Sequence, residues 1–154
     1  EALADLQREM EGWVVGLRLV SLVLRRHQDP EAFLKKLHGG VQQAQAYLIQ
    51  EVITQQPAPI QDWLVRSAIL NRFCEPLIQA VCAAETDAGA AVADRGGFID
   101  TAIAGNLFVI SLDGGDEWFR YHHQFKQLLL QELNRRMVPG DIARLYRRAG
   151  QWFE

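Results

Sequence analysis

The sequence predicts a mainly α-helical fold with one small β-hairpin. Three observations favour this fold class. Most segments carry apolar residues at helical spacing, such as 122–137, where Phe125, Leu128, Leu129 and Leu133 share one face. Proline or glycine separates the segments, most distinctly in "PAP" at 57–59. The pattern becomes β-rich only over 107–121, where two short runs flank the turn "DGGD" at 113–116, as in a β-hairpin.

A helical subdomain is expected over residues 1–57. Residues 12–26 are apolar nearly all round, which is typical of a buried helix. A second helix is expected over 29–37, because Asp29 is a good N-cap and the proline after it suits a first turn. A third helix is expected over 41–56. Its apolar stripe comprises Val41, Ala44, Tyr47, Leu48 and Val52.

A second subdomain is expected over residues 58–138. Its predicted elements are helices at 60–70, 75–83 and 98–106, the hairpin, and the helix 122–137, with a loop at 84–97. Two helices, a short helix, a hairpin and a final helix follow one another in the order of a winged-helix fold. Residues 139–154 then form one further helix, which is expected to begin at an Asp141 cap.

Composition and charge exclude several classes of protein. The chain has 154 residues, 49% of them apolar and 23% charged, with a net charge of −3, which is the mix of a globular domain. It has no run of about 18 apolar residues to span a membrane, and no signal-peptide pattern. Cys74 and Cys82 lack CxxC spacing, so we expect reduced thiols and a cytoplasmic location. Because both ends read as helix, we expect a piece of a longer protein.

Two adjacent histidines, His122 and His123, are the candidate functional residues within "WFRYHHQF" at 118–125. Adjacent side chains diverge and no further ligands have suitable spacing, so a metal site is not expected. No GxSxG motif is present to supply a catalytic nucleophile. Helical period places His122 in line with Leu129, facing inward, and His123 outward. The residues alone favour His122 as a buried junction histidine bonded to backbone.

The charge of the second subdomain argues against DNA binding. Residues 58–137 contain seven Lys and Arg against ten Asp and Glu, hence a net charge of 7 − 10 = −3. The turn of the hairpin carries Asp113, Asp116 and Glu117, and the helix 98–106 has an acid and no base. Since phosphates require the opposite sign, we expect no direct DNA contact.

Five segments in order carry a resemblance to a known family. They are "EGWVVGLRL", "YLIQEVI...WLVRSAILNRF", "NLFVISLD", "WFRYHHQFKQLLLQEL" and "LYRRAGQWFE", and together they cover essentially the whole chain. They resemble the middle region of the large ATP-dependent LuxR-type transcriptional regulators, the MalT-like family of the bacterial maltose regulator. These regulators are NTPases of the STAND class. The resemblance implies a helical domain, a winged-helix domain and, at 139–154, the first helix of a helical-repeat sensor domain.

The resemblance also implies partners and site residues. An N-terminal nucleotide-binding domain would hold ATP or ADP, and a C-terminal helical-repeat domain would follow. In related STAND proteins, a histidine at the position of His122 contacts the β-phosphate of ADP. The stretch Gly12, Trp13 and Val14 matches the adenine side of the nucleotide site, although Val14 replaces the usual proline. His123 replaces an aspartate of the family motif, so its role stays open.

The expected function is that of a non-catalytic regulatory segment that couples nucleotide state to activation and self-association. The chain lacks a GxxxxGK[ST] phosphate loop, so it is expected neither to be an enzyme nor to hold a cofactor by itself. One alternative is a helical and winged-helix protein-interaction module without a nucleotide role. A second, less favoured alternative is a DNA-binding winged helix that acts alone.

Overall fold

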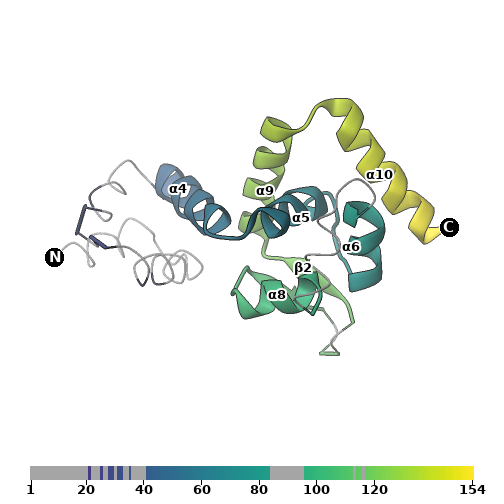
Figure 1. Ribbon diagram of the computed structural model, residues 1–154, viewed down its shortest axis with the longest axis horizontal. Helices are drawn as coiled ribbons and strands as arrows, with labels where there is room; N and C mark the ends of the chain where they lie inside the picture. Colours follow the sequence, from purple (N-terminus) through teal and green to yellow (C-terminus); the bar gives the residue numbers. More distant parts are fainter. Residues whose placement is uncertain are drawn as a thin grey trace. The chain divides into compact units, whose positions relative to one another are not determined.

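A computed structural model describes two long stretches of the chain, 41–83 and 96–154, the latter without Asp113 and Asp116 (Figure 1). Some single residues before these stretches are also described, namely Ser21, Arg25, Gln28, Asp29, Glu31, Ala32 and Lys35. Most of the predicted helix 12–26 and nearly all of the predicted loop 84–97 therefore lie outside the described residues.

The chain divides into two compact units, Glu1–Gln56 and Pro57–Glu154. In the first unit, helix α4 spans Val41–Thr54, which confirms the helix predicted over 41–56. Its buried side chains are Leu48, Ile49, Val52 and Ile53. The predicted cap at Asp29 is also confirmed, because its Oδ1 accepts a hydrogen bond of 3.1 Å from the backbone N–H of Ala32.

The second unit contains five described helices and one hairpin, which confirms the mainly α-helical prediction. The helices are α5 (Ala58–Ser67), α6 (Glu75–Cys82), α8 (Phe98–Ala104), α9 (His123–Arg136) and α10 (Pro139–Phe153). Helix α5 packs against both α6 and α9, and α10 runs beside α6 (Figure 1). None of the helices in the described stretches is long and apolar enough to cross a bilayer.

Two helices begin earlier than predicted because proline occupies their first turns. Helix α5 begins at Ala58, with Pro57 as N-cap and Pro59 in its first turn, and α10 begins at Pro139 instead of at the expected cap Asp141. A first-turn residue has no helical acceptor for its N–H, so proline costs nothing there, and its fixed φ suits the helix. Asp141 instead forms an ion pair with Arg144 one turn later.

The predicted hairpin is confirmed, with strands shorter than expected. Strand β1 (Val109–Ser111) pairs antiparallel with β2 (Phe119–Tyr121). A third segment joins this sheet at one residue, Phe73, which exchanges two backbone hydrogen bonds of 2.8 and 2.9 Å with Phe119. Strands are predicted from alternating polar and apolar residues, and one paired residue such as Phe73 shows no such alternation. The order of α5, Phe73, α6, α8 and the hairpin is that of a winged helix.

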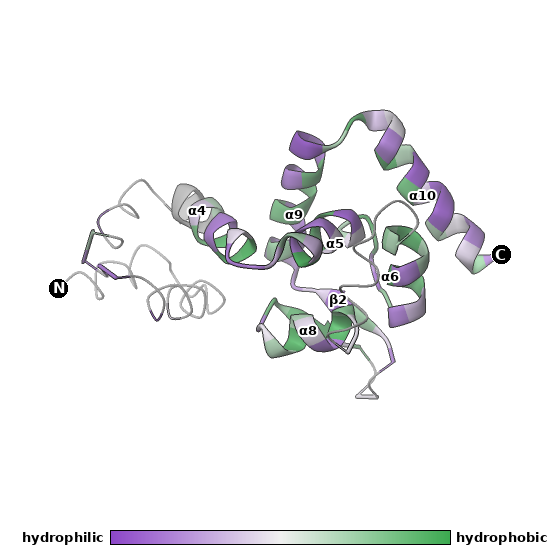
Figure 2. Ribbon diagram, in the orientation of Figure 1, coloured by the Kyte–Doolittle hydropathy of each residue, from purple (hydrophilic) through white to green (hydrophobic). Residues whose placement is uncertain are grey.

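Aromatic side chains form the centre of the second unit. Trp63, Phe73, Phe98 and Phe125 are fully buried, and the Trp63 and Phe98 rings lie 5.9 Å apart between centroids. Figure 2 shows hydrophobic and hydrophilic residues alternating along α9 and α10, as expected of helices with one buried face. Phe125, Leu129 and Leu133 lie on the buried face of α9, as predicted, whereas Leu128, predicted on the same face, is half-buried.

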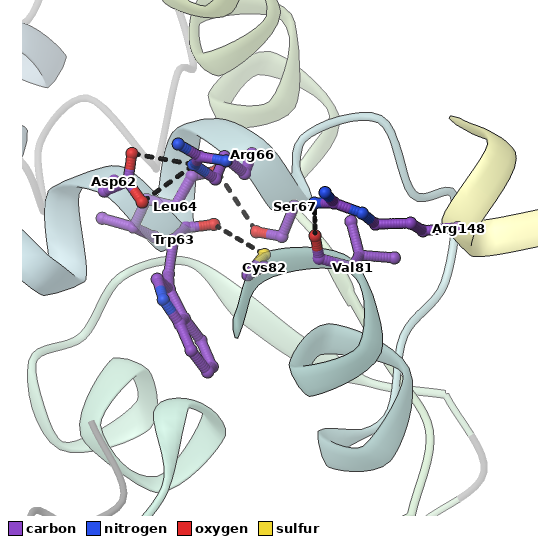
Figure 3. Close-up of polar contacts among 8 residues, drawn as sticks. All are labelled: Asp62, Trp63, Leu64, Arg66, Ser67, Val81, Cys82 and Arg148. Atoms are coloured by element: carbon purple, nitrogen blue, oxygen red, sulfur yellow. Dashed lines mark hydrogen bonds and ion pairs between the residues drawn. The ribbon is translucent and has the colours of Figure 1, made fainter. Parts of the chain in front are cut away.

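Helices α5, α6 and α10 are joined by contacts to backbone oxygens (Figure 3). The Cys82 thiol on α6 lies 3.9 Å from the carbonyl oxygen of Trp63 on α5, and burial raises the pKa of this thiol. Arg148 on α10 donates to the carbonyl oxygen of Val81 at 3.3 Å. Cys74 and Cys82 are both buried and unbonded to each other. The assignment of 139–154 to a separate repeat domain stays a prediction.

Glu75, in the first turn of α6, caps a different helix. Its two carboxylate oxygens accept hydrogen bonds of 2.9 Å from the backbone N–H groups of Phe98 and Ile99, at the start of α8. The first amides of a helix have no acceptor within the helix, and the positive end of the helix dipole favours a carboxylate. Gly97, which precedes α8, has a φ of 102°, a region that disfavours side chains. Glu75 therefore holds α8 against α6.

Replacing Glu75 with alanine is expected to destabilise the chain by about 1–2 kcal/mol, because two N–H groups at a buried helix start lose their acceptor. Urea denaturation followed by circular dichroism measures the loss. Gln131→Ala, which truncates an exposed side chain within α9, is the control. Equal stability of the two variants would contradict the capping role.

Glu132 is a buried acid on the otherwise apolar face of α9. Its side chain is 8% exposed and forms ion pairs with Arg135 and Arg136, one turn later on the same helix. The hydrogen bond from Arg135 is the main cause that lowers the pKa of Glu132 below its ordinary value of 4.5. The carboxylate is therefore more acidic in the folded chain than in the unfolded chain.

The lowered pKa of Glu132 predicts that its ion pairs with Arg135 and Arg136 stabilise the fold above pH 4.5. This stabilisation is lost as the pH falls further. Below that pH the unfolded chain takes up a proton that the folded chain resists, so the free energy of unfolding falls. Glu132→Gln is expected to lose about 1–2 kcal/mol near pH 7 and much less near pH 3. Urea denaturation at both pH values checks this, with Glu154→Gln at the exposed chain end as control. A difference from the native chain that does not change with pH would contradict the prediction.

Candidate functional site

The junction of β2 and α9 carries four basic residues, Arg120, His122, His123 and Lys126. His122 lies between strand and helix, as the N-cap of α9, with an extended backbone at φ −55° and ψ 138°. Helical period predicts that His122 faces inward, but His122 lies before the first residue of α9, so that period does not apply to it. Its side chain is nevertheless half-buried, and His123 is exposed, as predicted.

The backbone of His122 is held on both sides. Its N–H donates to the carbonyl oxygen of Phe108 at 2.8 Å, and its own carbonyl accepts from the N–H of Lys126 at 2.9 Å. Phe108 belongs to the turn that follows α8, in which Phe108 and Asn106 have positive φ values of 58° and 54°. Left-handed backbone is uncommon outside glycine, although asparagine tolerates it after a helix. The carbonyl that accepts from His122 is therefore positioned by an unusual turn.

The residue before His122 fixes the junction to the core. The Tyr121 hydroxyl lies 2.6 Å from Oγ of Ser67, the last residue of α5, and both side chains are buried. The Tyr121 ring contacts the rings of Phe73 and Phe125, with centroids 4.7 and 5.7 Å away. Burial raises the pKa of this hydroxyl, so it stays protonated. Tyr121 thereby joins α5, the sheet and α9 directly beside His122.

The surroundings of His122 favour the neutral form of its imidazole. Desolvation by burial, followed by the charges of Arg120 and His123, lowers its pKa below the ordinary 6.5. A neutral imidazole has one N–H donor and one acceptor nitrogen. Nδ1 is buried and has no hydrogen-bond partner among the described residues, so the predicted bond from this side chain to backbone is absent there.

The surroundings of His122 suit an anion. Helix α9 has 14 residues, has no acidic residue in its first turn and makes no side-chain hydrogen bond at its N-cap. Its first amides and the positive end of its dipole therefore favour negative charge. Lys126 adds a cation, although burial lowers its pKa and its Nζ donates to Oδ1 of Asn71 at 2.5 Å. The junction therefore presents hydrogen-bond donors and positive charge of the kind that suit a phosphate or carboxylate.

Gly12, Trp13 and Val14 lie outside the described residues, so their place on the adenine side stays a prediction. Within the described stretches, no group of three His, Cys, Asp or Glu is placed to hold a metal ion. Sequence reasoning missed the contribution of Phe108, because only the three-dimensional turn places its carbonyl at the junction.

Comparison with known proteins identifies relatives over most of the chain. It is 27% identical over 146 residues, 93% of the chain, to the Serine/threonine-protein kinase PknK of Mycobacterium tuberculosis. It is 26% identical over 150 residues, 94% of the chain, to the HTH-type transcriptional regulator MalT of Vibrio campbellii. The regulator of the same name from Klebsiella pneumoniae is 25% identical over 125 residues, or 80% of the chain.

These relatives are much longer than the chain. The matched regions span 12% of the kinase, 15% of the Vibrio regulator and 13% of the Klebsiella regulator. Residues 49–139, from within α4 to the start of α10, match the family described as the MalT winged helix domain. Because that match covers more than half of the 154 residues, the chain belongs to the MalT winged helix domain family.

Proposed function

We propose that this chain is a non-catalytic regulatory segment of an ATP-dependent, LuxR-type transcriptional regulator of the STAND class. Its family, and its similarity to proteins named HTH-type transcriptional regulator MalT, support the proposal. The sequence contains no GxxxxGK[ST] phosphate loop, so ATP or ADP would bind to a neighbouring nucleotide-binding domain of the same longer protein. The proposal assigns no kinase chemistry to the region shared with PknK.

In this proposal His122 contacts the β-phosphate of ADP bound in the neighbouring domain and so stabilises a closed form. One observation carries the assignment: a half-buried, neutral imidazole sits at the N-terminus of α9, and its buried Nδ1 lacks a partner in the described part of the chain. An imidazole N–H next to free helix amides is a good donor to a phosphate oxygen. Gly12, Trp13 and Val14 would lie toward the adenine.

Exchange of ADP for ATP, together with inducer on a C-terminal helical-repeat domain, would release the closed form for self-association. A ligand shifts such an equilibrium only through contacts that differ between the two states, and the phosphate contact of His122 supplies one. A regulator of this kind would act in the cytoplasm. Its winged helix would pack against protein and leave DNA to another domain, since exposed Asp100 on α8 and exposed Glu117 in the hairpin repel phosphate.

A second candidate function is that of a protein-interaction module with no nucleotide role. A pocket of about 650 Å³ elsewhere on this winged helix favours it, because the pocket combines acidic and aromatic side chains. The pocket lining does not include His122, so binding at the pocket does not require the nucleotide contact.

The proposed contact predicts that His122→Ala weakens ADP binding about tenfold in the longer protein that includes the nucleotide-binding domain, which corresponds to about 1.4 kcal/mol. The affinity is measured by calorimetry. His123→Ala, which removes an exposed imidazole one residue away, is the matched control and should bind ADP as the native protein does.

The proposed contact also predicts the direction in which ADP affinity changes with pH. A phosphate beside His122 favours the protonated imidazole, so ADP binding raises a pKa that lies below 6.5 in the structure without ADP. Protons are then taken up on binding, and the affinity rises as pH falls toward that value. The part of the pH dependence that comes from protonation of His122 should be absent in His122→Ala. The part that comes from protonation of ADP should be the same in the native protein and the variant. Unchanged affinity and unchanged pH dependence in His122→Ala would overturn the proposed contact.

A further inference from the structure

A pocket of about 650 Å³ lies on the second unit, away from the His122 junction. Four elements contribute to it: the start of α6, the exposed side of α8, the strand β2 with the residues just before it, and the end of α10. Figure 1 shows α6, α8 and β2 as neighbours within this unit. The side chains that matter below are Glu75, Asp100, Ile103, Glu117, Trp118 and Trp152.

The charged residues that line this pocket are all acidic, although the guanidinium of Arg72 lies over the ring of Trp118 at its wall. Glu75, Asp100 and Glu117 line it, and no Lys, Arg or His is among its lining residues in the described part of the chain. Glu75 already caps α8 with both oxygens. Asp100 and Glu117 are exposed, and the ion pairs between described residues involve neither of them. These two carboxylates therefore remain to attract a cation, and they repel phosphates of nucleic acid.

The same pocket has an aromatic wall. The rings of Trp118 and Trp152 meet edge to face, with centroids 6.1 Å apart and planes at 77°. Trp152 is 37% exposed and Ile103 is 48% exposed, so apolar surface remains uncovered beside the carboxylates. The face of a tryptophan ring attracts guanidinium and ammonium groups. Arg72 demonstrates this for Trp118, since its guanidinium carbon lies 5.0 Å from the ring centroid.

We propose that this pocket binds a basic peptide segment of a partner protein. An arginine or lysine of that segment would lay its aliphatic stem along Trp118, Trp152 and Ile103, with its charge facing Asp100 and Glu117. Long cationic side chains bind in this way because stem and charge need different surroundings. The inference is independent of the proposed role of His122, because it uses none of the residues of that junction.

A peptide pair that differs only in charge tests the proposal with the whole chain. The probe is a fluorescein-labelled peptide of alternating leucine and arginine, and its match replaces each arginine with the neutral isostere citrulline. Fluorescence anisotropy at low salt is expected to give at least about tenfold tighter binding of the arginine peptide. Added salt should reduce the difference, because the carboxylates are exposed.

Variants of the chain locate the binding. Asp100→Asn combined with Glu117→Gln keeps the shapes of both exposed side chains and removes both charges. This double variant should bind the arginine peptide about tenfold more weakly and scarcely distinguish it from the citrulline peptide. Asp100→Asn alone should weaken binding, whereas Glu31→Gln, which removes one exposed charge from the other unit, should not.

Three results would overturn the inference. Equal binding of the two peptides, or binding of neither, would show that the pocket does not recognise positive charge. Native-like binding of the arginine peptide by the double variant would place the site elsewhere. The third result has two parts: a short DNA duplex displaces the peptide from the native chain, and the Trp152→Leu variant no longer binds that duplex. Together they would make the surface a nucleic-acid site.

Discussion

The buried hydrogen bond between Ser67 and Tyr121 is the contact on which the arrangement of the winged helix depends. It joins the last residue of α5 to the last residue of β2 at 2.6 Å. The Tyr121 ring contacts Phe73 on the third segment of the sheet and Phe125 on α9. One side chain therefore sets the position of the hairpin against two helices. Both hydroxyls are buried, so leaving either without a partner would be costly.

The two candidate sites lie at opposite ends of the strand that Tyr121 terminates. Glu117 and Trp118 precede β2 and line the acidic pocket, while His122 follows β2 and begins the anion-favouring junction. Three residues, Phe119–Tyr121, separate Trp118 from His122, so the two are four steps of extended chain apart, a span of roughly 13 Å. A short, rigid strand thus presents opposite charge preferences at its two ends.

Sequence patterns predicted the helices of the second unit and its hairpin, because apolar spacing and turn residues are local signals. Local signals also misplaced the starts of α5 and α10, since Pro57 and Pro139 suit a helix start as well as a break. The helical period was the wrong guide to His122, which caps α9 from an extended conformation. The cap that Glu75 gives to α8 and the meeting of Trp118 with Trp152 join residues far apart in sequence. Neither could be predicted without the tertiary fold.

The central claim is that the β2–α9 junction presents His122 to a nucleotide phosphate. The most direct test is an experimental structure of the longer protein with ADP bound to its nucleotide-binding domain. The account predicts an imidazole nitrogen of His122 at roughly 2.7–3.2 Å from a β-phosphate oxygen, with the backbone bond from His122 to Phe108 retained. An ADP-bound structure in which the imidazole points away, or lies more than about 6 Å from every phosphate oxygen, would contradict it.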